Sequence, residues 1–370
     1  MSIPFFDLDF DQLEEQAVSN VLQSKWISMG SNTVAFEERF AELHGLKHGV
    51  ALANCTVALH LALKIVGVGK GDEVIVPSLS FVATAAAVIH CGGVPVFADI
   101  ESMEDWTISP NEMIKKITPR TKAIIPMHYG GFGANMFEIM AIAKQNGIAV
   151  VEDACHAPLA ELKGQKLGSF GDVACYSFYS NKNISTGEGG MLITNNQEYA
   201  ERAKILRTHG MTSTAYDRVN GKGFYDVLEV GYNYRMDDIH SAIGLVQLNK
   251  AIKALSKREI IANRYRERLS SCEDIVVPFK DYIGISANHV FGIYLKNKDL
   301  FSVREHLKQA GITTSNHYLP IHLFSCFHSV ETTLPLTEKI AKNQISLPIY
   351  PNLSLEAVDY VCDCLLEFCK

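Results

Sequence analysis

The residue with the clearest potential for chemistry is Lys182, in the segment YSFYSNKNISTGEGGM (176–191). This lysine lies between short polar residues, after an apolar run that ends near Ser177 and before a cluster of glycines. Most lysines are solvated and need no special function, because their charged group prefers water. Lys182 therefore becomes a candidate nucleophile only if other reactive groups are expected at the same place.

Two further segments place polar residues where a buried strand should end, which is where open α/β sheets bind ligands. In ANCTVALH a helix is expected to begin at Thr56, where backbone N–H groups and the hydroxyl can bind an anion. The alternative is that Thr56 only caps the helix. In IAVVEDACHA one of the acids Glu152 and Asp153 should point into the crevice, because side chains alternate along a strand. The alternative for Asp153 is a helix cap.

An anion site, a carboxylate and a lysine near a hydroxyl are the groups that a pyridoxal phosphate (PLP) enzyme requires. The phosphate would occupy the helix start at Thr56, the aldehyde would form a Schiff base with Lys182, and Asp153 would keep the pyridine nitrogen protonated. A lysine ammonium is a weak nucleophile, and a pyridinium nearby together with partial desolvation favours the neutral amine. The three segments together predict a PLP site.

The elements that position these segments follow a strand-helix alternation from about residue 48 onward. The expected strands are apolar throughout, which is typical of strands buried on both faces. They are GVALAN (49–54), DEVIVP (72–77), VPVFADI (94–100), KAIIPMHY (122–129), IAVVEDA (148–154), DVACYSF (172–178) and GGMLITN (189–195), with helices at 56–66, 81–92, 136–147 and 197–207. We predict the α/β fold class, with a mainly parallel central sheet flanked by helices.

The pattern changes after about residue 250. A charged helix is expected at 253–269, a strand at HVFGIYLK (289–296), and helices at 302–311 and 354–368. We predict that residues 1–250 form an N-terminal arm and a large PLP-binding domain. Residues 251–370 should form a small α+β domain.

The composition excludes several other classes of protein. The 370 residues carry a net charge of -7, which argues against a nucleic-acid partner or an anionic membrane surface. No apolar run is long enough to span a membrane, and the acidic opening is unlike a signal peptide. The nine cysteines contain no CxxC pair, so neither a metal site nor a disulfide framework is expected. These features favour the cytoplasm.

The sequence resembles a known family of enzymes. The blocks VVEDACHA, GSFGDVACYSFYSNKNISTGEGGM and GYNYRMDDIHSAIGLVQL are similar to those of the DegT/DnrJ/EryC1/StrS sugar aminotransferases, and the similarity runs nearly end to end. The resemblance implies a fold-type-I PLP-dependent transferase. It also implies that Lys182 is the Schiff-base lysine and proton shuttle, that Asp153 pairs with the pyridine nitrogen, that His156 lies beside the ring and its phenolic oxygen, and that Phe81 stacks on the ring.

The same resemblance assigns residues to the cofactor phosphate. Thr56 and Ser177 would bind it, with help from the backbone around Cys55. Asn233 would reach the phosphate of a neighbouring subunit, which implies a homodimer with shared active sites. Relatives usually carry a smaller residue at Cys55 and often alanine at Cys155, but cysteine tolerates burial, so we expect the cofactor to bind.

Other residues are weaker candidates for contact with substrate. The segment NHYLPIHL resembles the family's substrate segment and contributes His317, Tyr318 and His322, although each histidine could equally be structural. Glu188 is a further candidate, and the alternative is a buried structural acid. A subset of the family has histidine in place of the lysine and catalyses dehydration, so Lys182 argues for amino transfer.

The expected reaction is amino transfer from L-glutamate to a keto group of a nucleotide-linked deoxysugar, for surface polysaccharide, glycan or antibiotic-sugar biosynthesis. The segment PMHYGG looks more like that of relatives that aminate C4 than like the version found in many C3 enzymes, so the resemblance favours C4 over C3; the nucleotide stays open between UDP, dTDP and GDP. Arg304 is the single arginine after residue 268, so a carboxylate clamp of the amino-acid aminotransferase kind is not indicated. The alternatives are a non-nucleotide keto sugar or cyclitol as acceptor, or a non-catalytic regulatory protein that binds PLP or a sugar nucleotide.

Overall fold

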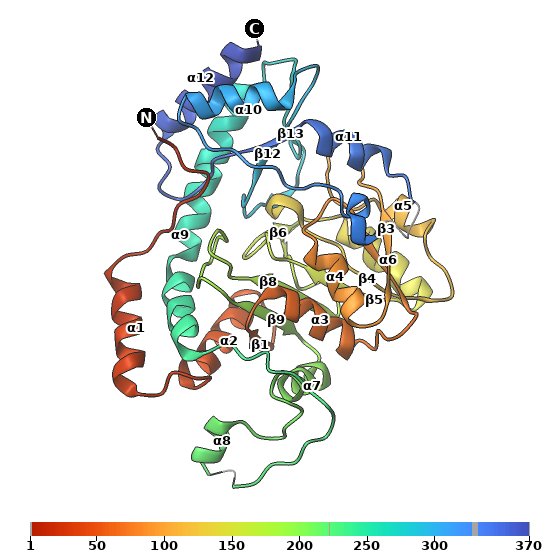
Figure 1. Ribbon diagram of the computed structural model, residues 1–370, viewed down its shortest axis with the longest axis vertical. Coiled ribbons are helices and arrows are strands. Elements are labelled where there is room, and N and C mark those ends of the chain that lie inside the picture. The colour runs from red at the N-terminus through yellow and green to blue at the C-terminus, as the bar shows by residue number, and fades with distance from the viewer. Residues whose placement is uncertain (1, 222, 328–331, 370) are drawn as a thin grey trace.

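A seven-stranded sheet forms the centre of the molecule in the computed structural model (Figure 1). The structure describes residues 2–221, 223–327 and 332–369. The strand order is β1-β9-β8-β5-β4-β2-β3. All neighbours are parallel except those of β9, which runs antiparallel to β1 and β8. The strands are β1 (His48–Leu52), β2 (Glu73–Pro77), β3 (Val94–Ala98), β4 (Thr121–Ile124), β5 (Ala149–Asp153), β8 (Val173–Ser177) and β9 (Gly190–Thr194). The predicted α/β class is confirmed.

Alternate residues of these strands enter two different hydrophobic cores, because side chains alternate across a sheet. Val150 packs into one core and Val151 into the other. Helices α3 (Cys55–Ile65), α4 (Ala83–His90) and α7 (Gln197–Arg207) supply one core, and α2 (Ser31–Leu43), α6 (Met136–Asn146) and part of α9 (Asp238–Leu269) supply the other. The apolar strands of the sequence are therefore covered on both faces, as their pattern predicts.

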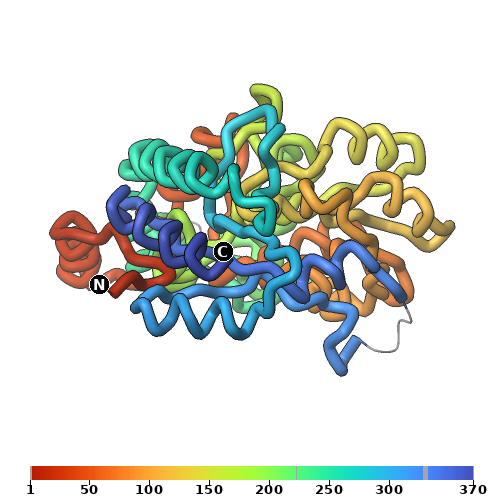
Figure 2. The backbone as a smooth tube through the Cα atoms, turned by 90° about the horizontal axis from the view of Figure 1, so that it is seen from above, coloured from red at the N-terminus to blue at the C-terminus, as the bar shows by residue number. Residues whose placement is uncertain are grey.

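A second, antiparallel sheet of order β10-β12-β13 lies in the C-terminal part of the chain. Its strands are β10 (Ile275–Val276), β12 (Phe291–Leu295) and β13 (Gln344–Leu347). Helices α10 (Leu300–Gln309) and α12 (Leu355–Cys369) pack with it in a separate core. Figure 2 shows α12 (dark blue) beside α9 (teal), in agreement with the packing of the two helices against each other.

Helix α9 joins the two parts and crosses the predicted boundary between residues 250 and 251 without interruption. Leu248 packs into the core of the large sheet, whereas Tyr265 packs into the core of the small one. Ile3, which falls in the N-terminal arm expected within residues 1–250, belongs to the same core as Tyr265. The division into residues 1–250 and 251–370 stays a prediction.

The remaining elements are short or peripheral. Helix α1 and strand β13 have no counterpart among the expected elements, and a third small sheet of order β11-β6-β7 connects residues 284–285 to the large part. The other elements are α1 (Gln12–Ser24), α5 (Pro110–Ile114), α8 (Ala215–Val219), α11 (Pro335–Asn343), β6 (Glu161–Leu162), β7 (Gln165–Lys166), β11 (Gly284–Ile285) and the 3-10 turns at Tyr129–Gly131, Ile321–Leu323 and Ser325–Phe327.

Candidate active site

The carboxyl ends of β5 and β8 bring Asp153 and Ser177 to the same edge of the central sheet, because the two strands are parallel neighbours. The chain continues from Ser177, whose Oγ accepts from Tyr179 N at 3.3 Å, into a turn in which Lys182 N donates to Tyr179 O at 2.8 Å. The side chain of Lys182 is partly buried, and its Nζ lies 3.4 Å from Nε2 of His289. The lysine is thus directed inward rather than solvated.

The two acids at the end of β5 point to opposite faces of the sheet. Glu152 is fully buried and accepts backbone N–H groups of Gly168, Phe170 and Gly171 at 2.7 to 2.8 Å. Asp153 accepts from Thr84 Oγ1 at 2.8 Å and from the backbone N of Cys155 at 3.3 Å. The alternative of a helix cap is wrong, since a turn rather than a helix follows Asp153. Asp153 is therefore the acid held at the site.

The start of α3 offers free backbone donors. Asn54 is the cap residue, because its Oδ1 accepts from Val57 N at 3.0 Å, and the helix begins at Cys55. The alternative of Thr56 as the cap is therefore wrong. Among the described residues, the amides of Cys55 and Thr56 and the Thr56 hydroxyl have no hydrogen-bond partner. These unsatisfied donors at a helix N-terminus fit a phosphate group.

Three histidines, His156, His289 and His317, lie near Lys182. The ring centroid of His156 lies 4.3 Å from that of His289 and 6.5 Å from that of His317. His156 Nε2 lies 2.8 Å from the hydroxyl of Tyr318, and His317 Nδ1 lies 2.9 Å from the hydroxyl of Ser346. The structure therefore brings His156, His317 and Tyr318 together with Lys182, as the sequence analysis requires.

Burial determines the protonation of these side chains. Desolvation, and to a lesser degree the charge of Lys182, lowers the pKa of His156 well below its usual value and lowers the pKa of His317 to about 3. Desolvation likewise raises the pKa of the Cys55 and Cys155 thiols. The histidines are neutral and the cysteines are protonated at neutral pH, so no thiolate competes with Lys182 as a nucleophile.

Phe81 presents an exposed ring at the start of the segment leading into α4. Its side chain is 54% exposed, and its ring centroid lies 6.0 Å from that of Tyr318. A phenylalanine this exposed has an open face available for a planar ligand. This placement fits the stacking role that the resemblance implies, and the role itself stays a prediction.

Three candidates lie apart from this group. Asn233 is exposed and pairs with Thr208 in an isolated bridge. Glu188 is exposed, so the alternative of a buried structural acid is wrong. His322 is buried but pairs with Ser78 Oγ at 2.7 Å and with Glu338. These contacts fit a structural role for His322.

His289 is not among the site residues expected from the sequence, although the strand expected at 289–296 begins with it. Two glycines explain its position: His289 N donates to Gly130 O at 2.8 Å, and Ala287 N donates to Gly131 O at 3.1 Å. A side chain on Gly131 would come within 2.9 Å of Asn288 N, so the close approach requires glycine. The glycines of the PMHYGG segment are therefore explained by the close approach of residues 287–289 to their backbone.

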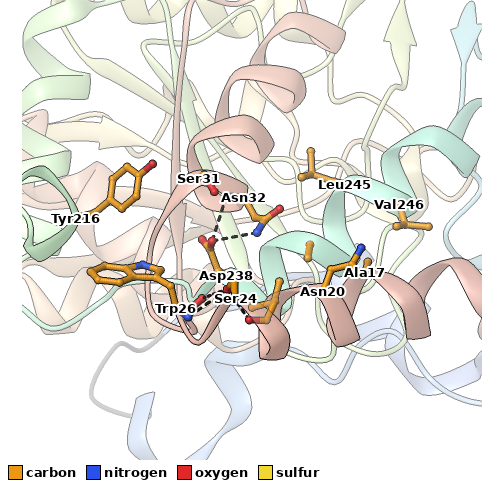
Figure 3. A pocket seen from close by; sticks show the side chains of 12 residues that line it. Ala17, Asn20, Ser24, Trp26, Ser31, Asn32, Tyr216, Asp238, Leu245 and Val246 are labelled. Carbon is orange, nitrogen blue, oxygen red and sulfur yellow. Dashed lines mark hydrogen bonds between the residues drawn. The ribbon is translucent and has the colours of Figure 1, made fainter. Parts of the chain in front are cut away.

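A separate pocket of about 360 Å³ lies between α1, α2 and α9 (Figure 3). Its floor contains Asp238, which accepts from the backbone N of Gly30 at 2.7 Å and of Thr33 at 3.0 Å and so fixes the start of α2. Trp26 and Tyr216 approach each other at one side. None of the site residues predicted from the sequence lines this pocket, so it is not the PLP site.

Within the described ranges, no cluster of three or more histidine, cysteine or acidic side chains could hold a metal ion. In the same ranges, no helix combines the length and the apolarity needed to cross a membrane.

The topology and the residues at the strand ends define a class of protein: a fold-type-I PLP-dependent enzyme of the aminotransferase kind. The chain belongs to the DegT/DnrJ/EryC1/StrS aminotransferase family, whose model matches residues 9–366. It is 38% identical over 368 residues to the spore coat polysaccharide biosynthesis protein SpsC of Bacillus subtilis strain 168, covering 96% of this chain and 94% of SpsC. It is 34% identical to the GDP-perosamine synthase of Escherichia coli O157:H7, covering 99% and 98% of the two chains.

Solved structures agree with this assignment. A structure from Streptococcus pneumoniae, described as the PLP form of a sugar aminotransferase, superposes with a TM-score of 0.93 at 28% identity and covers 100% of this chain and 99% of its own. The protein is therefore a PLP-dependent sugar aminotransferase by family and fold. Its own residues fit the cofactor, because the free amides at the start of α3 suit the phosphate and Asp153 suits a protonated ring nitrogen.

Proposed function

We propose that the protein transfers the amino group of L-glutamate to the C4 keto group of a nucleotide-linked deoxysugar, in the cytoplasm, for the synthesis of a polysaccharide or another glycan. The name of one relative gives a GDP-linked product, and the name of another refers to a spore coat polysaccharide. The preference for C4 over C3 rests on the PMHYGG segment, which resembles that of relatives that aminate C4.

We base the proposal on Lys182, whose Nζ lies beside the neutral His289 at the sheet edge where β5 also ends with Asp153. A lysine there can take up and release a proton, whereas the dehydrating relatives have histidine at this position. No arginine side chain after residue 268 reaches the site, since Arg304 lies on α10 and donates to Thr314 O at 3.4 Å. This fits a sugar as the acceptor, because a keto sugar has no α-carboxylate that an arginine would have to bind.

The bound PLP supplies an electron-withdrawing ring that accommodates the electron pair left when the donor loses its Cα proton. Lys182 Nζ would take the proton from Cα of the donor and deliver it to the C4′ carbon of the cofactor, which is general acid-base catalysis by one group. Asp153 would hold the proton on the ring nitrogen of the bound cofactor, and Thr84 and the Cys155 amide keep its carboxylate in place. Thr56 and Ser177 bind the phosphate.

We also propose that the active unit is a homodimer in which Asn233 reaches the phosphate held by the partner subunit. Asn233 is exposed, and so are the apolar side chains that precede it, with Phe224 exposed by 96% and Val230 by 92%. Exposed apolar side chains in a group mark an interaction surface. Asn233→Ala should weaken PLP binding, and a mixed dimer of Asn233→Ala with Lys182→Ala chains should regain about one working site in two.

The acceptor is identified with protein that has been loaded with PLP, treated with L-glutamate and separated from the donor. This protein is mixed in turn with 4-keto and 3-keto deoxysugars linked to UDP, dTDP and GDP, with the matching free keto sugars, and with a keto cyclitol. Mass spectrometry should show an amino product from a nucleotide-linked 4-keto sugar. Faster amination of a 3-keto sugar would contradict the ring position, and equal amination of a free keto sugar or cyclitol would contradict the nucleotide. Binding without any amination would indicate a regulatory protein.

A further inference from the structure

A chain of three hydrogen bonds leads from a backbone carbonyl to Lys182. Asn183 Nδ2 donates to Ala287 O at 2.7 Å, Asn183 Oδ1 lies 3.0 Å from His289 Nδ1, and His289 Nε2 lies 3.4 Å from Lys182 Nζ. The direction of every bond follows from the first one, because a carbonyl oxygen can only accept. The amide of Asn183 must therefore present its oxygen to His289, and this oxygen can also only accept.

The tautomer of His289 follows from the same argument. Since Asn183 Oδ1 accepts, His289 Nδ1 carries the hydrogen, and a neutral ring then has a bare Nε2. Burial is the main cause that lowers the pKa of His289 well below its usual value, with His156, Lys182, Arg258 and His317 adding to it. The ring is therefore neutral, and its lone pair on Nε2 faces the amine of Lys182.

The neighbouring His156 has the opposite tautomer. Its Nδ1 lies 3.3 Å from the backbone N of Gly130, which can only donate, so Nδ1 is bare and Nε2 carries the hydrogen. This Nε2–H donates to the hydroxyl oxygen of Tyr318 at 2.8 Å. Two histidine rings 4.3 Å apart thus differ in function: His156 is committed to Tyr318, and only His289 offers an acceptor to Lys182.

We propose that His289 is a positioning residue for Lys182, which it holds through the bare Nε2, and that Asn183 sets the tautomer that makes this possible. The role rests on the proposed proton transfer by Lys182, because a lysine released from the cofactor needs a fixed direction to reach one carbon and then another. An acceptor at Nε2 also stabilises the amine once it carries the transferred proton, since hydrogen bonds from a charged donor are the stronger ones. The opposite tautomer would donate its N–H to the lone pair of the neutral amine, which is the lone pair that must take the proton, and it would offer no acceptor once the amine is charged.

The tautomer is tested directly in the full-length protein labelled with ¹⁵N-histidine, with and without PLP. Ring-nitrogen NMR distinguishes bare from protonated nitrogens, and His289→Gln identifies the signal of His289. We expect a hydrogen on Nδ1 and none on Nε2 near neutral pH, and we expect Asn183→Leu to abolish this preference. A hydrogen on Nε2, or a charged ring, in the wild-type protein would overturn the proposal.

The consequence for Lys182 is tested with the donor half-reaction. His289→Leu should slow the reaction with L-glutamate about tenfold to a hundredfold, because a misdirected group costs that much. His289→Gln should recover most of the rate, since its amide can donate to Asn183 and accept from Lys182. The matched control is His60→Leu. It removes another buried imidazole, which lies on α3 and has no hydrogen bond to Lys182. Equal rates in His289→Leu and His289→Gln would contradict the role.

The two tests fail separately. If the wild-type protein ignores L-glutamate, the proposed function fails, but the tautomer of His289 can still be read from the NMR spectrum. If the wild-type protein reacts and His289→Leu reacts equally fast, the proposed function stands and the positioning role is wrong.

Discussion

Two groups of residues meet at Lys182, and they come from different kinds of structure. The sheet-edge group, Asp153, Ser177 and Thr56, lies where strands of the central sheet end. The crossing segments, residues 286–290 and 316–318, belong to the C-terminal part and reach the site through long-range hydrogen bonds. The first group supplies charge and phosphate donors, and the second supplies neutral imidazoles and a hydroxyl. The sheet therefore fixes where the catalytic charges lie, whereas the crossing segments fix the direction of the Lys182 amine and the polarity around it.

The largest effect is expected for Lys182→Ala. Loss of the group that moves the proton should slow the donor half-reaction by at least about 10,000-fold, and the visible band of the lysine-bound cofactor should be absent. Stopped-flow absorption after mixing with L-glutamate measures both, and circular dichroism checks that the fold is intact. A variant that turns over at the wild-type rate would contradict the mechanism.

The second largest effect is expected for Asp153, and it should distinguish this acid from its neighbour Glu152 on β5. Asp153→Asn should slow the donor half-reaction about a hundredfold to a thousandfold, because the amide cannot keep the ring nitrogen charged. Glu152→Gln is the matched control on the opposite face of the same strand, and it should lower the free energy of unfolding by about 2 kcal/mol with a smaller change in rate. Urea denaturation and single-turnover kinetics distinguish the two. The reverse result would mean that the wrong acid has been assigned to the ring.

A smaller effect is expected from the crossing segments. Tyr318 accepts from His156, and its own O–H has no acceptor among the described residues. Burial raises the pKa of Tyr318, so the hydroxyl stays protonated and can donate to a bound oxygen. Tyr318→Phe should lower kcat/KM for the keto sugar about tenfold and leave the donor half-reaction nearly unchanged. An equal loss in both half-reactions would show that Tyr318 serves the cofactor instead.

The difference between the two groups also explains what the sequence could predict. Asp153 and Lys182 follow apolar strands within a few residues, so local pattern and resemblance were enough to place them at one edge. Asn54 rather than Thr56 caps α3, because the side chain that closes a helix start is decided by backbone geometry over one or two residues. His289 could not be identified, since only the pairing with Gly130 and Gly131 brings it across the chain.

The smallest effect is expected when the pH is lowered mildly and the rate of the donor half-reaction is measured. Burial holds the pKa of His156 and His289 well below 6.5 and lowers that of His317 to about 3, so none of these histidines gains a proton near pH 6.5. The rate of the donor half-reaction should therefore not change near pH 6.5 through ionisation of His289. The pH profiles of the wild-type protein and of His289→Gln should have the same shape in this range. The contribution of the three histidines to stability, in contrast, is complete above pH 6.5 and declines toward pH 3, because the unfolded chain binds the protons that the folded chain excludes. Urea midpoints at pH 7 and pH 4.5 measure this decline, and an unchanged midpoint would contradict the burial of the three rings.

The most direct measurement is the visible absorption of the PLP-loaded protein before and after addition of L-glutamate, with 2-oxoglutarate measured in the same sample. We expect a visible band that disappears when L-glutamate is added, with one molecule of 2-oxoglutarate formed for each site. A band that ignores L-glutamate would contradict the donor and point to another amino compound or to a regulatory role. No band at all would contradict the assignment of Lys182, on which the whole account depends.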